Sequence, residues 1–284
     1  LISLILLNID IFIEEIIGIE EIQTGSRRGL YLALVSIASA IAPPIAGSLL
    51  EIGHGTYGYV YLASALCVIP FIAIIIMNFR KFHDPVYIDL SIQKMVHVFK
   101  TQSDIRNILL VSFHLQLFFT WTIIYIPLYL LIVAGFTWVE IGIIIFVGLT
   151  GYILFEYPIG IIADKYIGEK EMMAFGFLLL TVVISWFAFI PHAGIGVWMV
   201  AMFLSRVGAS FIEATSESYF FKHAQSSHAH TISLFRMTRP LSTLVGAIIG
   251  GLALFYLPFN MVFIVLAIIL IPGFFFTMYI HDTR

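Results

Sequence analysis

The sequence has a single cysteine, Cys67, and only 11% of its 284 residues are charged. One cysteine excludes an internal disulfide framework. Cys67 lies within an apolar run, where we expect it to pack as a small apolar residue. The net charge of −3 argues against a basic surface that binds nucleic acid. Such a low content of charge also excludes a soluble domain of this length.

Apolar residues make up 61% of the chain, and its mean hydropathy is +1.04. Runs of about 20 apolar residues recur along the whole sequence, and each is long enough to cross a hydrocarbon core of about 30 Å as a helix. Within lipid such runs must be helical, because a helix satisfies its own backbone polar groups. The sequence therefore predicts an all-α integral membrane protein that crosses the lipid bilayer many times.

These runs predict about nine transmembrane helices. They are expected at residues 1–18, 30–50, 57–79, 107–134, 138–163, 171–190, 194–221, 240–256 and 259–280. The first run begins at Leu1, without the basic segment that opens a signal peptide. We interpret it as a helix cut within its length.

The basic residues are distributed unevenly among the connections between these spans. Every Lys and Arg except Arg206 falls in one of the connections 19–29, 80–106, 164–170 and 222–239, or in the C-terminal tail. The alternate connections hold none. Because cytoplasmic loops accumulate Lys and Arg, this pattern predicts a plasma-membrane protein with a cytoplasmic C-terminus.

The longest connection divides the predicted helices into two groups. We divide the chain into a partial N-terminal half (1–79), a central loop (80–106) and a C-terminal half (107–284). A short amphipathic helix is expected on the inner membrane surface within the central loop. Its apolar face is formed by Ile92, Met95, Val96 and Phe99.

Two pairs of acidic residues indicate an internal repeat. Asp10 and Glu14 in the first span are four residues apart, as are Glu213 and Glu217 in the seventh. A run of small residues around Pro43 has a counterpart at a similar offset. Such repeats are common in transporters, and an offset of about six spans predicts three further spans before the first residue. Chance similarity among apolar helices is the alternative.

A short motif follows the fifth predicted span. It begins after Glu156 and Pro158 and consists of Gly160, Ala163, Asp164, Lys165, Gly168 and Lys170. The motif resembles the loop signature of the major facilitator superfamily, with one extra residue before Gly168 and with Glu169 in place of a basic residue. The resemblance implies a bundle of twelve helices, of which this chain holds the fourth to the twelfth. It also implies transport by alternating access, and so a protein that is not an enzyme.

Two further motifs resemble the same family. Small residues around Pro43 and Gly47 are similar to a weakened fifth-helix motif that is associated with exchange of a substrate for protons. Close helix packing is the alternative explanation. Arg206, Gly208 and Ala209 resemble the family's motif of an arginine followed by small residues. The family resemblance implies a small-molecule substrate, coupling to protons, no cofactor and a monomer.

Ionisable residues inside the spans are candidates for function, because a charge at the centre of a bilayer costs about 3 kcal/mol. Arg206, Glu213 and Glu217 lie within about 20° of one helix face. Either Arg206 attracts an anionic substrate group while Glu213 exchanges a proton, or Arg206 pairs with an acid so that its helix can insert. Asp10 and Glu14 occupy the matching face of the first span.

The fourth span has a stripe of aromatic and imidazole side chains at helical spacing, formed by His114, Phe118, Trp121 and Tyr125. Either the stripe lines a cavity and stacks on flat apolar substrates, with His114 as a proton site, or it packs against other helices. Three histidines of the connection 222–239 have no cysteine or acid beside them, so no metal site is predicted there. They are His223, His228 and His230.

Glu156 and Asp164 are candidates for a gate at the inner end of the fifth span. Glu156 either couples protonation to closure or bonds to a neighbouring helix end, and Asp164 caps a helix through a contact that breaks and re-forms. We therefore predict a secondary active transporter, with proton-coupled efflux of an apolar or amphipathic compound as the preferred function. Proton-coupled uptake of an anionic metabolite is the alternative. A membrane enzyme or sensor without transport is the alternative from another class.

Overall fold

The protein is described by a computed structural model over residues 24–78, 92–163, 167–223 and 229–281. Within these ranges every regular element is a helix, which confirms the all-α prediction. The helices are α2 (Thr24–Ile52), α3 (Gly58–Asn78), α4 (Ile92–Thr101), α5 (Ser103–Ile132), α6 (Trp138–Ile162), α7 (Glu169–Phe187), α8 (Ile195–His223), α9 (Ala229–Tyr256) and α10 (Met261–Met278).

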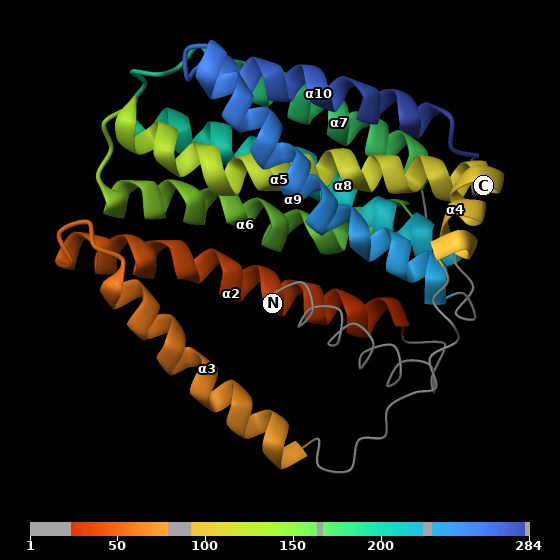
Figure 1. Ribbon diagram of the computed structural model, residues 1–284, viewed down its shortest axis with the longest axis horizontal. Helices are drawn as coiled ribbons and strands as arrows, with labels where there is room; N and C mark the ends of the chain where they lie inside the picture. Colours follow the sequence, from red (N-terminus) through yellow and green to blue (C-terminus); the bar gives the residue numbers. More distant parts are fainter. Residues whose placement is uncertain (1–23, 79–91, 164–166, 224–228, 282–284) are drawn as a thin grey trace.

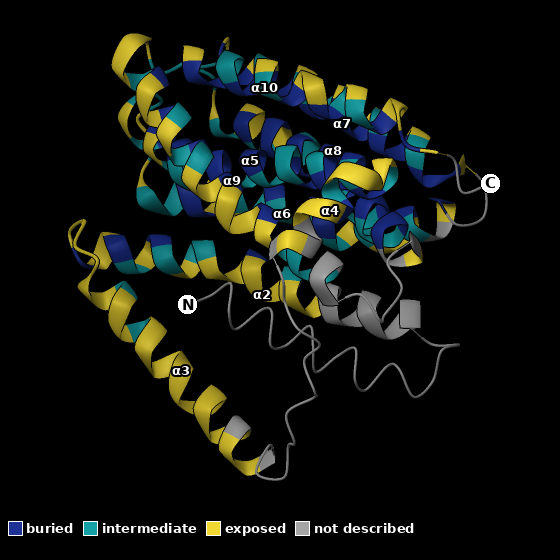
Figure 2. Ribbon diagram, turned by 45° about the vertical axis from the view of Figure 1, so that its right-hand side comes forward, coloured by how far each residue is buried: buried dark blue, intermediate teal, exposed yellow. Residues whose placement is uncertain are grey.

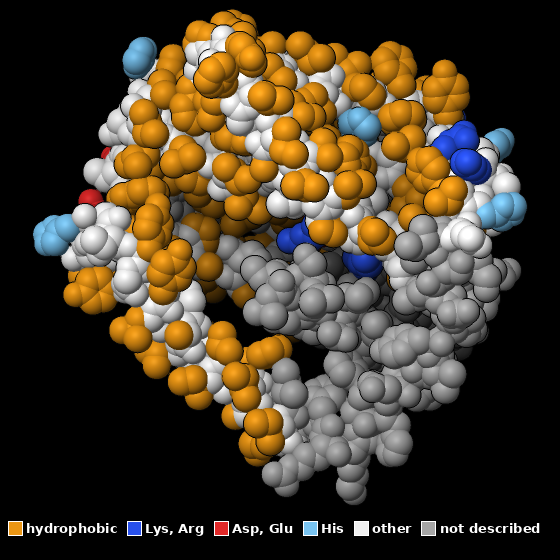
Figure 3. Space-filling model, viewed as in Figure 1, with side chains coloured by type: hydrophobic (Ala, Val, Ile, Leu, Met, Phe, Trp, Pro, Cys, Tyr) orange, Lys and Arg blue, Asp and Glu red, His pale blue; other side chains and the backbone are white. Residues whose placement is uncertain are grey.

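Seven helices in the described ranges are long and apolar enough to cross a membrane, namely α2 and α5 to α10. Hydrophobic side chains cover most of the face shown in Figure 3, where the few Lys and Arg side chains lie at one end and in the recess between α3 and the bundle. The predicted span at 1–18 lies outside the described residues. The predicted start of a span at Pro240 is wrong, because α9 continues through this proline from Ala229. Prolines are tolerated in membrane helices when neighbouring groups satisfy the freed carbonyl.

The bundle is formed by α5 to α10, with α2 lying against α6 (Figure 1). Rings from four helices pack together near one end of the bundle. Tyr129 of α5 packs edge-on against Phe263 of α10, with ring centres 4.8 Å apart, and Phe187 of α7 packs against Trp198 of α8 at 5.2 Å. Such aromatic pairs each contribute about 0.5–1.5 kcal/mol beyond the area that they bury. This cluster therefore joins α5, α7, α8 and α10 into one unit.

The helix α3 leaves the bundle and points away from it (Figure 1). Most of its side chains are exposed (Figure 2), including Cys67. The expectation that Cys67 packs as a small apolar residue is therefore wrong. Whether a residue on an apolar helix is buried depends on what packs beside that helix. This neighbour cannot be inferred from the helix's own sequence.

The helix α4 lies in the central loop, where a short amphipathic helix is predicted; its position on the inner membrane surface stays a prediction. Val98 is buried and Phe99 packs against the core, whereas Val96 is 46% exposed. The helix lies against α5 and α9 at the end of the bundle that holds the C-terminus (Figure 1). Contact with these two helices accounts for the burial of Val98, which is not part of the predicted apolar face.

The last turn of α10 is tied to α5 and α8 at the same end of the bundle. Asn107 donates from Nδ2 to the Tyr279 carbonyl over 3.1 Å, and Tyr219 donates from its hydroxyl to the His281 carbonyl over 3.0 Å. The imidazole Nδ1 of His281 lies 2.9 Å from a carboxylate oxygen of Asp104. These contacts satisfy carbonyl groups that a helix end leaves without an intrahelical partner.

Close backbone contact between α2 and α6 depends on two glycines. A Cβ added at Gly142 would lie 2.7 Å from the carbonyl oxygen of Pro43, and one added at Gly47 would overlap the carbonyl of Trp138. The small residues around Pro43 and Gly47 therefore support the helix-packing interpretation. The second small-residue run, at 246–251, also allows a close helix contact. A Cβ added at Gly250 of α9 would overlap the ring of Tyr125 on α5.

We predict that Gly142→Ala lowers the thermal unfolding temperature, because the added methyl group forces α2 and α6 apart at a cost of about 1–3 kcal/mol. The measurement is thermal unfolding of the protein in detergent, followed by size-exclusion chromatography. Gly251→Ala is the matched control, since a Cβ there meets nothing within 4 Å. Alanine favours the helix, so this control should be as stable as the parent protein or more so. Equal stability of the two variants would contradict the close contact.

Candidate functional site

A cluster of ionisable side chains lies where α2, α6, α8 and α9 meet. Glu156 of α6 accepts a hydrogen bond from the Ser36 hydroxyl of α2 over 3.2 Å. Glu217 of α8 forms an ion pair with Arg236 of α9, also at 3.2 Å. Sequence reasoning placed Glu156 and Glu217 in spans but could not connect them, because their helices are adjacent only in the folded chain.

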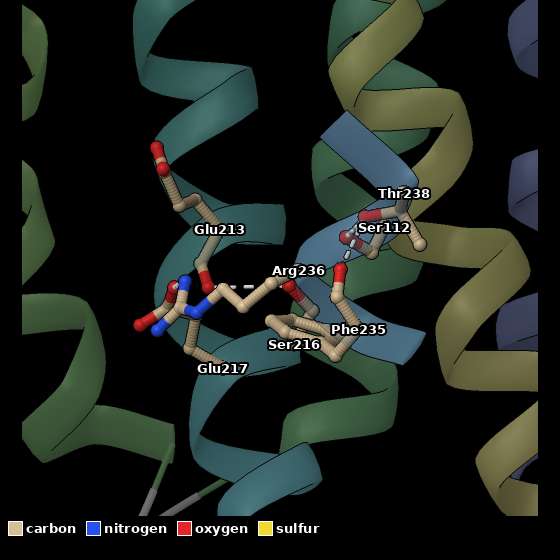
Figure 4. Close-up of polar contacts among 7 residues, drawn as sticks. All are labelled: Ser112, Glu213, Ser216, Glu217, Phe235, Arg236 and Thr238. Atoms are coloured by element: carbon tan, nitrogen blue, oxygen red, sulfur yellow. Dashed lines mark hydrogen bonds and ion pairs between the residues drawn. The ribbon is translucent and has the colours of Figure 1, made fainter. Parts of the chain in front are cut away.

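Glu213 lies on α8 one turn before Glu217, and both side chains project from the same side of the helix (Figure 4). Glu213 is half-buried. Among the described residues, the charged groups close enough to act on its carboxyl group are Glu156, Glu217, Arg239 and Arg206. With Arg236, the structure thus brings together three acids and three arginines in the bundle: Glu156, Glu213, Glu217, Arg206, Arg236 and Arg239.

Arg236 reaches from α9 toward α8 and lies beside Glu217 (Figure 4). It was expected in a cytoplasmic connection, as was Arg239, but both lie within α9 because this helix begins earlier than predicted. Two arginines assigned to a loop are therefore part of the polar cluster. The sequence signal that could have found them is their spacing, since residues three apart share one face of a helix.

Arg206 is almost completely buried, with 5% of its surface exposed. Its guanidinium carbon lies 5.1 Å from the ring centre of Phe118 and 6.0 Å from that of Tyr152. No hydrogen bond or ion pair of Arg206 with an acid is formed within the described ranges, and its Nε has no hydrogen-bond partner there. The interpretation that Arg206 pairs with an acid stays a prediction, and among these residues it rests on the electrostatic interaction between Arg206 and Glu213. Rings that face the cation also stabilise it.

The glycine before Tyr152 makes room for Arg206. A Cβ at Gly151 would lie 3.1 Å from the Arg206 Cβ and 3.2 Å from the Phe203 carbonyl oxygen. The helices α6 and α8 therefore approach closely at this point. This approach places the Tyr152 ring beside the guanidinium group.

The predicted stripe on α5 is divided among different neighbours. Trp121 donates from Nε1 to the Gly246 carbonyl, and Tyr125 donates from its hydroxyl to the Ala247 carbonyl, each over 2.9 Å. Both side chains are buried against α9, which favours the packing interpretation. Their assignment to a substrate pathway stays a prediction.

His114 packs against α10. Its ring centre is 5.6 Å from that of Phe276 on α10, and its Nδ1 lies 2.7 Å from the Leu110 carbonyl oxygen. Within the predicted stripe, only Phe118 contacts Arg206. A proton-pathway role for His114 stays a prediction as well.

The loop motif is described in part. Gly168 has φ +98°, a backbone conformation that favours glycine, and it directly precedes α7. Gly160 faces open space, and Lys170 is half-buried in the first turn of α7. Other predicted site residues lie outside the described ranges, namely Asp10, Glu14, Asp164 and Lys165. His228 also lies outside them.

Glu169, which departs from the loop signature, makes a contact that sequence reasoning missed. Its side chain is buried, accepts a hydrogen bond from the Ser218 hydroxyl over 3.3 Å, and forms an ion pair with Lys222. An acid in the first turn of α7 also interacts favourably with the positive end of the helix dipole. The available signal was an acid just after a loop glycine, where a helix begins. Its partners on α8 could not be inferred from spacing.

The sequence model of the Major Facilitator Superfamily matches residues 108–284, which is more than half of the chain. The chain therefore belongs to this superfamily, whose members are secondary transporters of small molecules. It is a multi-pass membrane protein, and the match extends from α5 to the end of the chain. A search of curated proteins found no match to the sequence.

We predict that Glu217→Gln lowers the free energy of unfolding by about 1–3 kcal/mol, because it leaves the charge of Arg236 without its carboxylate in a mostly buried place. Thermal unfolding in detergent measures the loss. The exchanged pair Glu217→Arg with Arg236→Glu should recover part of it. An unchanged unfolding temperature in Glu217→Gln would show that the ion pair contributes nothing to stability.

Proposed function

We propose that this chain functions as a proton-coupled secondary transporter in which Glu213 and Glu156 take up and release the coupling proton. The supporting observation is that these two carboxylates lie on different helices, α8 and α6, but belong to the same polar cluster. Glu217 has Arg236 as a counterion, whereas Glu156 is hydrogen-bonded to the Ser36 hydroxyl and forms no ion pair within the described ranges. A buried carboxylate with no counterion is stable only if it is neutral or reaches water. The protonation of such a group therefore depends on which side of the membrane it can reach water from.

Glu156 is suited to couple protonation to movement. Its hydrogen bond with Ser36 joins α2, in the proposed N-terminal half, to α6, in the proposed C-terminal half. A contact between two halves that exists in one arrangement and is broken in another makes a two-state element. We propose that binding or loss of a proton at Glu156 changes the stability of this contact, and so favours one arrangement.

We propose efflux of an apolar or amphipathic compound as the direction and substrate of transport. The feature that supports this proposal is the pair of aromatic rings, Phe118 and Tyr152, beside the cluster. In this proposal the protein is a monomer in the plasma membrane, with its C-terminus in the cytoplasm. Loop charges support this orientation, because basic residues accumulate on the cytoplasmic side.

A second candidate function is uptake of an anionic metabolite together with protons. It is favoured by Arg206, a buried cation with no acid paired to it within the described ranges. Efflux and uptake differ in the direction of accumulation and in the charge of the substrate. Vesicles of known orientation can therefore separate them.

We predict that Glu213→Gln abolishes gradient-driven transport, because an amide cannot bind and release a proton in this pH range. The measurement uses inside-out vesicles with an imposed pH gradient and two probes, the flat amphipathic dye ethidium and radiolabelled benzoate. Proton-driven accumulation of ethidium in these vesicles supports efflux. Accumulation of benzoate in right-side-out vesicles supports uptake.

Glu51→Gln is the matched control, since Glu51 is exposed at the end of α2. It should leave transport unchanged. Gradient-driven flux that survived the combined change Glu156→Gln and Glu213→Gln would show that the proposed proton sites are wrong.

We predict that Glu156→Gln slows gradient-driven transport at least tenfold but allows exchange of substrate across the membrane without a gradient. The amide can still accept a hydrogen bond from Ser36, so the contact between α2 and α6 persists while its response to protons is lost. Exchange of labelled for unlabelled probe at equal pH on both sides measures the retained activity. Equal loss of exchange and of gradient-driven transport would contradict a role in coupling alone.

A further inference from the structure

We propose that Arg206 and Tyr152 form a binding subsite for the oxyanion group of an organic substrate, either a carboxylate or a phosphate. The ring faces of Phe118 and Tyr152 would lie beside the adjoining part of that substrate. The inference rests on the second candidate function, transport of an anionic compound, and names the residues that would bind its oxyanion group.

The first support is the burial of two hydrogen-bond donors side by side. Arg206 and Tyr152 are 5% and 6% exposed, and the guanidinium carbon is 6.0 Å from the centre of the tyrosine ring. Within the described ranges neither the Arg206 Nε nor the Tyr152 hydroxyl has a hydrogen-bond partner. A buried donor without a partner costs about 1–3 kcal/mol, so a ligand that accepts from both would recover this loss.

The second support is that the nearby acids are engaged elsewhere or displaced along the helix. Glu217 pairs with Arg236, and Glu156 accepts from Ser36. Glu213 follows Arg206 by seven residues on α8, which places its backbone about 10 Å further along the helix axis. Among the described residues, Arg206 is thus the arginine of the cluster that faces aromatic rings and forms no ion pair with an acid.

The chemistry of the two side chains selects an oxyanion. A guanidinium group presents a planar set of donors that fits two oxygens of a carboxylate or phosphate at once. The tyrosine hydroxyl can donate a third hydrogen bond. Arg206 lies near the middle of α8, and Tyr152 lies beside it on α6. At this depth in the bundle the pair is far from lipid headgroups, so a dissolved small molecule is the expected ligand.

The surrounding charges permit such a ligand. The acids that share the cluster are Glu156, Glu213 and Glu217, and the bases are Arg206, Arg236 and Arg239. When all six are ionised, their charges balance, so the acids do not make the cluster negative as a whole. Because Arg206 is included in this balance, the five groups around it carry a net charge of −1 when all are ionised, and protonation of one acid makes the surroundings of an anion at Arg206 neutral.

Equilibrium binding without a gradient tests the proposal. The full chain in lipid nanodiscs is titrated with benzoate and with inorganic phosphate, and benzamide serves as the neutral counterpart of benzoate. We expect Arg206→Gln to weaken binding of the preferred anion at least tenfold, a factor that about 1.5 kcal/mol of lost charge-assisted hydrogen bonding would produce. Arg206→Lys should recover part of the affinity, because it restores the charge but not the planar donors. Benzamide should bind equally to all of these proteins.

Tyr152→Phe keeps the ring and removes only the hydroxyl, so it tests the second donor with little disturbance of packing. It should weaken binding of the anion severalfold, whereas Tyr157→Phe, on an exposed part of α6, should not. Thermal unfolding of each variant establishes that it is folded. Tighter binding of benzoate than of phosphate assigns the subsite to carboxylates, and the reverse order assigns it to phosphates.

Equal affinity of the parent protein and Arg206→Gln for both anions, or binding of neither anion, would overturn the subsite. Proton-driven transport of ethidium that depends on Glu213 would then leave the proposed function intact. Conversely, anion binding that depends on Arg206 without any gradient-driven flux would contradict the transport proposal and leave the subsite standing.

Discussion

A charged side chain inside a bilayer must find a partner within the protein, and this requirement organises the polar cluster between α2, α6, α8 and α9. Arg236 satisfies Glu217, and Ser36 satisfies part of Glu156. Arg206 is stabilised differently, because the rings of Phe118 and Tyr152 face its guanidinium group. The cluster can therefore exist in an apolar bundle while keeping donors and carboxylates that a substrate or proton could engage.

Glycine contacts allow the helices to come close enough for these partners to meet. Gly142 and Gly47 let α2 reach α6 near one end of the two helices, and further along the same pair Ser36 meets Glu156. Gly151 in turn lets α6 approach α8 beside Arg206. Small residues and polar contacts thus depend on one another, because the hydrogen bonds require backbones that are closely packed.

The approximate positions of the described membrane helices could be predicted from the sequence, because a long apolar run in lipid is stable as a helix. The start of α9 was predicted too late, since Pro240 was interpreted as a boundary although the helix passes through it. That error placed Arg236 and Arg239 in a loop. Both residues belong to the cluster that the prediction had identified only through the acids and Arg206.

The candidate site could be predicted only as a set of helix faces. Spacing placed Phe118, Trp121 and Tyr125 on one stripe of α5. The neighbouring helices decide which of them reaches Arg206. Trp121 and Tyr125 instead donate hydrogen bonds to α9. In the same way, the pairing of Glu169 with Lys222 joins residues from two helices, and helical periodicity has no information about such contacts.

The fit of Tyr125 against Gly250 limits how the bundle can move. The tyrosine ring occupies the space that a side chain at position 250 would need, and its hydroxyl is bonded to the α9 backbone. A shift of α9 along α5 would press this ring against a backbone that has no room to yield. We therefore expect α5 and α9 to move together when the bundle opens.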